Sequence, residues 1–524
     1  MKKLLYCAFA SILLASCSTD LTDVEKRLDN LEGETKSASE QIDELKRKEP
    51  QLLSISFLSK DNSMQLVEDV NGEIIGDSVV ECWVKNIMSD KLLIPKVEFV
   101  GESIKLDDVP VAIGSSKHDF KRPVKLTITN GDKSKEYTIY VHSYTGLPVM
   151  WIETEGRKDI TSKEVYQRAS FKLVEDVKTR AAGDVIEDSV SIKGRGNATW
   201  SSYPKKPFNF KFDKKRSLLG MPEDKSWVLL ANYADKTFIR NHIAFYMGYM
   251  SNLNYTTRSH YVEVMLNGRY NGVYELCEKI KISKNRVNVG DDGFIMEIDA
   301  YAPGEADSRY FSIVHLNQVV NIKDPEVEYN DDNYNYAKEF VTIADSVLYS
   351  NNFTDPNSGW QKYLDMDSFI DWMLINEISK NLDSFWWSGY FSLKRGDKLR
   401  MEPLWDFDHS FGNYVRNGIE YPSGWAVKQH SWYARLFQDP AFVEKAKERY
   451  NFFYSKREDI MKEINACAQY LSLSSREDNN KWGTLYRNIG SDSDIWGSYQ
   501  NEVQSMKEWL NARFEWLKTE FDKM

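Results

Sequence analysis

The spacing of apolar residues changes twice along this chain of 524 residues, so the chain cannot form one uniform domain. Apolar residues first repeat at alternating intervals of three and four. They then alternate with polar ones beyond Pro50, and from about Gly146 long aromatic-rich segments mix both patterns. We therefore expect an α+β protein in which a helical segment and a small β domain precede a large mixed domain.

The N-terminus has the features of a secretory signal peptide. Lys2 and Lys3 precede an apolar run over 4–14, which is too short to span a bilayer, where about 20 residues are needed. The sequence Leu14-Ala15-Ser16-Cys17 resembles a bacterial lipobox, which implies cleavage after residue 16 and acylation of Cys17. We expect a chain anchored by lipid in the bacterial cell envelope, at the outer membrane or cell surface. The alternative is an ordinary signal peptide with an incidental cysteine.

Residues 17–49 are predicted to form a coiled-coil stalk. Heptad spacing appears at Leu21, Val24, Leu28, Leu31, Thr35, Ala38, Ile42 and Leu45. Self-association through 21–45 is one interpretation. A solvated amphipathic helix that spaces the body from the membrane is equally open.

Residues 50–145 are predicted to form a small Ig-like antiparallel β-sandwich. Short alternating runs cover 53–57, 79–84, 92–94, 124–128 and 137–141, and turn sequences such as Asn71-Gly72 separate them. We expect a spacer or adhesion module.

Residues 146–524 are predicted to form a two-lobed α+β body. Strands are expected at 150–153, 190–193, 208–212, 261–266, 272–276 and 294–298, and helices at 368–378 and 503–521.

Composition argues against two functional classes. The net charge of −11 and pI of about 5.4 disfavour a general nucleic-acid binder, which needs a basic face. The five cysteines form no CxxC pair and the seven histidines no HExxH, so we expect no zinc site.

The segment 376–413 is the strongest candidate for chemistry. Two strand-like runs, 385–393 and 399–405, flank the turn at Gly396 and predict a β-hairpin. This hairpin would bring together the two ends that carry Asn381, Asp383, Asp406 and Asp408. Carboxylates with an amide suit a hard divalent cation, as in phosphotransferases. The alternative is that these residues cap turns and helices.

Two further stretches are candidate phosphate-binding segments. Arg195 lies between Gly194 and Gly196, and several lysines follow, including Lys206 and Lys211. The alternative is a solvated strand edge protected by lysines. In 227–241, a buried strand, a turn and a helix carry Asp235, Lys236, Arg240 and Asn241, with helix capping and salt bridges as the alternative.

Together these segments resemble the spore-coat kinase (CotH) family over roughly 147–521. The resemblance is carried by 193–200 with 205–207, 218–222, 227–241, 267–274, Glu278 with 285–287, Trp405-Asp406-Phe407-Asp408-His409-Ser410-Phe411-Gly412, and 432–437.

The resemblance implies an atypical protein-kinase-like fold that binds ATP with Mg²⁺ or Mn²⁺ and phosphorylates Ser/Thr on an unknown protein substrate. Asp383 would orient the acceptor hydroxyl and Asp406 would bind metal, supported by Asn381 and Asp408. The nucleotide-binding candidates are Arg195, Lys206, Lys211, Lys236 and Glu278. A non-catalytic surface protein for glycan or protein binding, or for assembly, is the alternative, and glycoside hydrolysis is the weaker third hypothesis.

Overall fold

The computed structural model describes residues 26–27, 29–30, 49–66, 68–84, 91–175, 185–415, 418–489 and 494–524. The chain divides into two compact units, 1–144 and 145–524. The expected signal peptide, Cys17 and nearly all of the expected stalk lie outside the described residues.

The described part of the first unit is a β domain around one apolar core. Its main sheet has the order β5-β1-β2-β3-β10-β9-β6-β7. The strands are β1 (Gln51–Phe57), β2 (Val70–Ile75), β3 (Val79–Val84), β5 (Lys96–Val100), β6 (Ser103–Leu106), β7 (Val109–Pro110), β9 (Val124–Asn130) and β10 (Lys133–Ser143), with β4 (Leu92–Leu93) and β8 (His118–Asp119) as a separate pair. Along β9 every second residue is buried, as alternation predicts. The expectation of a purely antiparallel domain is wrong at one place, because β3 and β10 pair in parallel.

A closed barrel begins the second unit. Its strand order is β11-β12-β13-β14-β15-β17-β16. The strands are β11 (Val149–Thr154), β12 (Gln167–Val174), β13 (Val185–Gly194), β14 (Phe208–Arg216), β15 (Asp224–Leu230), β16 (Ser259–Leu266) and β17 (Arg269–Glu278). Parallel pairing of β11 with β16 closes the barrel, and the other neighbours are antiparallel. Because every strand is paired on both sides, the lysines near Arg195 do not protect a sheet edge, and that alternative is wrong.

A second, five-stranded sheet follows with the order β19-β20-β18-β21-β22. Its strands are β18 (Phe294–Ile298), β19 (Tyr310–Ile313), β20 (Gln318–Asp324), β21 (Gly389–Leu393) and β22 (Leu399–Met401).

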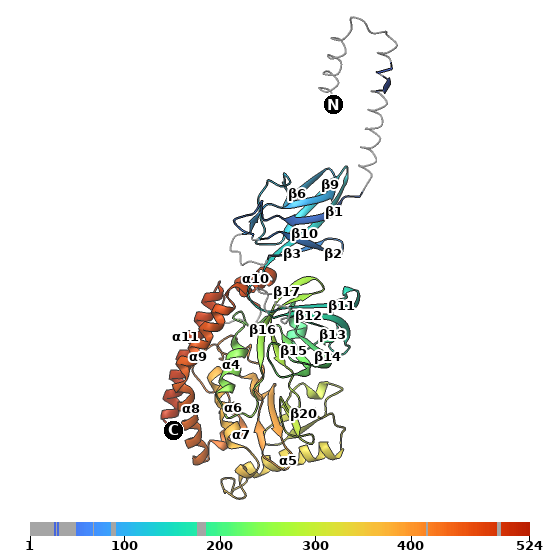
Figure 1. Cartoon of the computed structure of the whole chain (residues 1–524). Coiled ribbons are helices and arrows are strands. Elements are labelled where there is room, and N and C mark those ends of the chain that lie inside the picture. Colours follow the sequence, from blue (N-terminus) through green and yellow to red (C-terminus); the bar gives the residue numbers. More distant parts are fainter. Residues whose placement is uncertain are drawn as a thin grey trace. The chain divides into compact units, whose positions relative to one another are not determined.

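The helices in the described part of the second unit are α3 (Ala198–Ser202), α4 (Arg240–Tyr249), α5 (Asp332–Leu348), α6 (Met366–Ser379), α7 (Ser431–Leu436), α8 (Pro440–Ser455), α9 (Arg457–Tyr470), α10 (Ser472–Trp482) and α11 (Tyr499–Asp522). The helices α4, α6, α8, α9 and α11 lie on one side of these sheets, and α5 lies next to the second sheet (Figure 1). The helices α4 and α6 lie between the sheets and an outer layer of α8, α9 and α11 (Figure 1). From 366 to 379 α6 is buried on almost every side, which explains why its apolar residues follow one another without a polar face.

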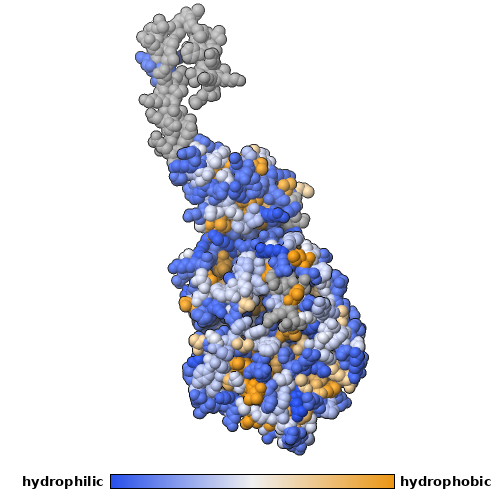
Figure 2. Space-filling view, turned by 180° about the vertical axis from the view of Figure 1, so that it is seen from behind, coloured by the Kyte–Doolittle hydropathy of each residue, from blue (hydrophilic) through white to orange (hydrophobic). Residues whose placement is uncertain are grey.

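Many aromatic residues of the described ranges fill the interior. Trp227, Trp360, Trp372 and Trp432 are almost completely buried. On the face in Figure 2, hydrophobic residues form small groups among hydrophilic ones. None of the helices in the described ranges combines the length and apolar character needed to cross a membrane.

Candidate functional site

The predicted hairpin exists, but both of its strands are shorter than expected. Strands β21 and β22 pair antiparallel, with Phe391 opposite Met401. Phe385 lies instead in a 3-10 turn, η4 (Asp383–Phe385). The second strand ends before Pro403, which has no N–H to donate to the sheet.

Turns, and not extended strands, position the acidic residues of this segment. Asp406 has a φ of +69°, in the left-handed region, so Asp406 and Asp408 do not share the face of a strand. Asp406 is exposed and Asp408 is half-buried. The argument that residues two apart face the same side therefore does not apply to this pair.

Three hydrogen bonds hold the Asp406 turn. The amide Nδ2 of Asn381 donates to the carbonyl oxygen of Asp406 at 3.0 Å. The hydroxyl of Ser388 donates to the Asp406 carboxylate at 3.1 Å. From α4, the side-chain oxygen of Asn241 accepts the backbone N–H of Phe407 at 2.7 Å. The turn is thus fastened to the segment that precedes β21 and to the helix α4.

Electrostatics place four carboxyl groups in one region. Burial raises the pKa of Asp408 to about 7; His409 lowers it, while the carboxylates of Asp406, Asp235 and Asp383 raise it further. Asp408 therefore lies close enough to Asp383 and Asp406 to be repelled by their charges. A divalent cation would relieve that repulsion, and oxygen donors are the set that Mg²⁺ or Mn²⁺ prefers.

Asp235 was considered as a helix cap; the N-cap position of α4 is Ile239 instead, but the Asp235 carboxylate does contact the start of this helix. Its carboxylate accepts the backbone N–H of Thr237 and of Arg240, both at 2.9 Å, and pairs with the Arg240 guanidinium. These contacts hold the Asp235 carboxylate at the start of α4. From there its negative charge acts on Asp408.

The loop after β13 reaches the acidic turn. The guanidinium of Arg195 lies 5.3 Å from the ring centroid of Trp405, the residue before Asp406. A side chain at Gly194 would come within 2.3 Å of the Trp200 ring, and Gly196 has a φ of +79°. The two glycines are thus needed for the loop that carries Arg195.

Sequence reasoning missed Lys279 and Lys281, which lie near Lys193 and Arg195. Burial lowers the pKa of Lys279, and so do the positive charges of Lys193, Lys281 and Arg195. These four cations therefore lie near one another at the ends of β13 and β17. Their signal in the sequence was Lys279-Ile280-Lys281 directly after Glu278, which spaces two lysines two residues apart at the end of a strand.

The other predicted nucleotide-binding residues contact neighbouring groups of the protein itself. Lys206 donates to the carbonyl oxygen of Trp200, and Lys211 lies 4.3 Å from the ring centroid of Tyr166. The remaining two are buried: Lys236 donates to the carbonyl oxygen of Arg487 at 3.2 Å, and Glu278 accepts from Tyr255 at 2.9 Å and from Arg258 at 3.1 Å. Their roles toward a nucleotide stay predictions.

Aromatic side chains border the site. Trp386 follows η4 and is 46% exposed. Trp387 stacks on Tyr301, with ring centroids 5.5 Å apart. Both tryptophans donate their backbone N–H to the carbonyl oxygen of Asp383, so the aromatic surface adjoins the acidic region directly.

Two solved structures are similar to parts of this chain at low identity. One is a DUF4623 family protein from Bacteroides eggerthii, with 12% identity, a TM-score of 0.14, and coverage of 36% of this chain and 58% of that one. The other is a putative glycoside hydrolase from Bacteroides thetaiotaomicron, with 14% identity, a TM-score of 0.16, and coverage of 54% and 80%. No curated protein matches the chain in sequence.

A family match covers most of the second unit. The sequence model of the CotH kinase protein family matches residues 191–517, which include the Arg195 loop, the hairpin, the acidic turn and most of α11. Since this match spans more than half of the 524 residues, the chain belongs to the CotH kinase protein family.

Proposed function

We propose that residues 146–524 form a kinase-like, two-lobed domain that uses ATP and a divalent metal ion to phosphorylate Ser/Thr on a protein. Family membership supports this proposal. The observation that carries it is the acidic turn itself: Asn381 contacts the Asp406 carbonyl oxygen at 3.0 Å, and the Arg195 guanidinium lies 5.3 Å from the ring of neighbouring Trp405. An acidic region next to a basic one can bind a metal ion together with a polyphosphate.

Each side of the site has a separate task in this proposal. Asp406 and Asp408, with the amide oxygen of Asn381, would hold Mg²⁺ or Mn²⁺, which neutralises phosphate charge when bound. Asp383 would orient the acceptor hydroxyl and take its proton. Arg195, with Lys193, Lys279 and Lys281, would bind the phosphate oxygens through charge-assisted hydrogen bonds.

The test compares Asp406→Asn with Asp397→Asn, an exposed position in the turn of the same hairpin. We expect the full chain to bind ATP with Mg²⁺ or Mn²⁺ in calorimetry and to transfer labelled phosphate to Ser/Thr peptides. Asp406→Asn should lower phosphotransfer about 100-fold or more, as loss of one group that stabilises transition-state charge does. Asp397→Asn should leave it unchanged. Absence of nucleotide binding, or full activity in Asp406→Asn, would refute the kinase proposal.

A second candidate function rests on the aromatic surface beside Asp383. Exposed Trp386 and the stacked pair Tyr301 and Trp387 could face sugar rings, which supports glycan binding without catalysis. A glycan array tests this candidate. It predicts ligands whose binding is lost in Trp386→Ala, together with no phosphotransfer by the unmodified chain.

Anchoring of the chain through Cys17 is also part of the proposal. We expect a mature chain that begins at Cys17, carries acyl groups and sediments with membranes. Cys17→Ser should move the protein into the supernatant and remove the acyl mass. Membrane sedimentation unchanged in Cys17→Ser would contradict lipid anchoring.

A further inference from the structure

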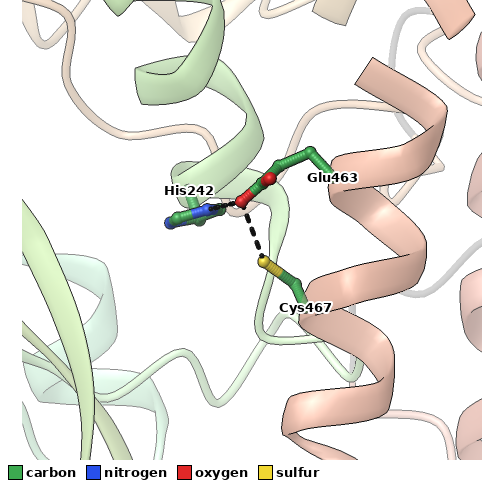
Figure 3. Close-up of side chains that lie close together, drawn as sticks. All are labelled: His242, Glu463 and Cys467. Carbon is green, nitrogen blue, oxygen red and sulfur yellow. Dashed lines mark hydrogen bonds and ion pairs between the residues drawn. The ribbon is translucent and has the colours of Figure 1, made fainter. Parts of the chain in front are cut away.

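Three side chains of types that can ligate a metal ion, His242, Glu463 and Cys467, lie close together (Figure 3), and none of them belongs to the proposed nucleotide site. His242 comes from α4, whereas Glu463 and Cys467 come from α9. The ring nitrogen Nε2 of His242 lies 2.8 Å from a carboxylate oxygen of Glu463, and the Cys467 sulfur lies 3.5 Å from the same oxygen. All three ligand atoms lie within 4.8 Å of one another.

Helix geometry explains why the three side chains meet. Glu463 and Cys467 are four residues apart on α9, so they project from the same face one turn apart. The helices α4 and α9 pack against each other, and this brings His242 to that face. The sequence showed neither a CxxC pair nor an HExxH motif because the ligands come from helices more than 200 residues apart.

The donor set is chemically specific. One nitrogen, one oxygen and one sulfur suit a borderline-soft ion such as Zn²⁺, whereas Mg²⁺ and Ca²⁺ prefer oxygen ligands alone. Zinc bonds of about 2.0–2.3 Å in tetrahedral geometry separate ligand atoms by roughly 3.3–3.8 Å. The observed separations are close enough that small side-chain movements would admit the ion.

The exposure of the cluster also fits a zinc site. Cys467 is 7% exposed, whereas the His242 and Glu463 side chains are 22% and 29% exposed. The thiol is therefore sheltered while the cluster stays accessible from solvent. Three protein ligands leave one tetrahedral position for water or an outside ligand.

We propose that His242, Glu463 and Cys467 bind one Zn²⁺ ion that joins α4 to α9. Asn241, the residue before His242, accepts the backbone N–H of Phe407 and so helps to hold the Asp406 turn. The zinc ion would therefore fix the helix that supports the proposed nucleotide site, without taking part in that site.

Zinc binding must displace protons. Burial lowers the pKa of His242, but its interactions with Cys467 and Glu463, together with the charge of Glu275 on β17, outweigh this and raise the pKa to about 10. Zn²⁺ binds the neutral imidazole and the thiolate, so the protons that these groups carry pass to the buffer, and no oxidant or reductant is needed. Apparent affinity should accordingly rise with pH between 6 and 8.

The first experiment titrates the full chain with Zn²⁺ after metal removal, against a chromophoric zinc indicator. We expect one tightly bound ion per chain. His242→Gln, Glu463→Gln and Cys467→Ala should each weaken binding at least about 10-fold to 100-fold. His260→Gln and Cys82→Ala are matched controls outside the cluster and should keep the affinity. If Cys467→Ala bound Zn²⁺ as tightly as Cys82→Ala does, the proposal would be overturned.

A second measurement guards against loss of folding in the variants. Co²⁺ added in place of Zn²⁺ should give visible bands of tetrahedral coordination and a near-ultraviolet thiolate-to-cobalt band. The thiolate band should be absent in Cys467→Ala and present in Cys82→Ala, while circular dichroism shows both to be folded. A spectrum of six-coordinate Co²⁺ without a thiolate band in the unmodified chain would also overturn the proposal.

Discussion

Glu263, in the barrel strand β16, is a carboxyl group with no exposed surface. Burial raises its pKa to about 8; the Tyr270 hydroxyl opposes this, whereas Glu477 and Asp478 add to it. Between about pH 4.5 and 8 the folded chain therefore holds a proton that the unfolded chain has lost, so this residue makes stability fall as pH rises through that window.

Glu263→Gln should remove this dependence. We expect little change in the free energy of unfolding at pH 5 and stabilisation at pH 8.5, with about 5 kcal/mol as the upper limit that the pKa shift allows. Urea unfolding at both pH values measures the difference. The control is Glu153→Gln, a more exposed carboxylate on β11, which should change stability little at either pH. Equal effects of Glu263→Gln at the two pH values would contradict the assigned charge state.

Gly272, in β17, has both a positive φ and no room for a side chain. Its φ is +101°, and an added Cβ would lie 2.2 Å from the Asp478 carboxylate, which pairs with buried Lys205. Gly272→Ala should lower the free energy of unfolding by about 3 kcal/mol or more, because strain and displacement of a buried ion pair add together. Gly396→Ala, with a φ of +79° and open space around it, should cost only about 1 kcal/mol in the same denaturation experiment.

The acidic residues show what sequence alone could predict at this scale. The hairpin spacing predicted that Asn381, Asp383, Asp406 and Asp408 would come together, and the Asn381 contact and the pKa of Asp408 agree with that proximity. The left-handed turn at Asp406 was not predictable, because it depends on Asn241 from a distant helix. For the same reason, sequence spacing gave no indication that Asp235 would add charge there.

At the scale of elements, Glu377 joins α6, α11 and the loop at 426–428. Its buried carboxylate accepts the backbone N–H groups of Val427 at 2.7 Å and Lys428 at 2.6 Å, and the Arg513 guanidinium at 2.9 Å. Arg513 also donates to the Glu377 carbonyl oxygen at 2.9 Å. One carboxylate thus fixes the distance between two helices that are far apart in sequence.

Glu377→Gln should cost about 3 kcal/mol of unfolding free energy, because it leaves the buried Arg513 charge without its partner. Asp522→Asn, which removes an exposed ion pair with Lys518 on the same helix α11, should cost less than about 0.5 kcal/mol. Chemical denaturation of both variants measures the contrast. If both variants lost a similar unfolding free energy, the burial of the Glu377–Arg513 ion pair would not be what determines its contribution to stability.

Local patterning predicted individual elements better than their pairing. The short apolar run at 294–298 was predicted as a strand and coincides with β18, and 3.6-residue spacing predicted the last helix within α11. Closure of the barrel was not predictable in this way. It depends on parallel pairing of β11 with β16, whose paired residues are more than 100 positions apart, and no local periodicity encodes that choice.

At the scale of the whole molecule, the two units have separate hydrophobic cores. The first core includes Val80, Leu126 and Ile139, and the second unit has its own clusters around the barrel and the helices. We therefore expect the full chain to unfold in two calorimetric transitions, since each core can be lost without the other.

The two transitions should respond to different changes. Ile139→Ala removes a fully buried side chain from the first core and should lower one transition by roughly 10 °C, from a cost of about 3 kcal/mol in a small unit. ATP with Mg²⁺ at about 100 times its dissociation constant adds about 2.7 kcal/mol to the unit that binds it, and should raise the other transition by roughly 3 °C. Asp406→Asn should abolish the second shift while leaving the first transition in place. A single transition that moves with both changes would mean that the two units unfold together. If ATP raised the same transition that Ile139→Ala lowers, the nucleotide would bind the first unit, which contradicts the proposed site.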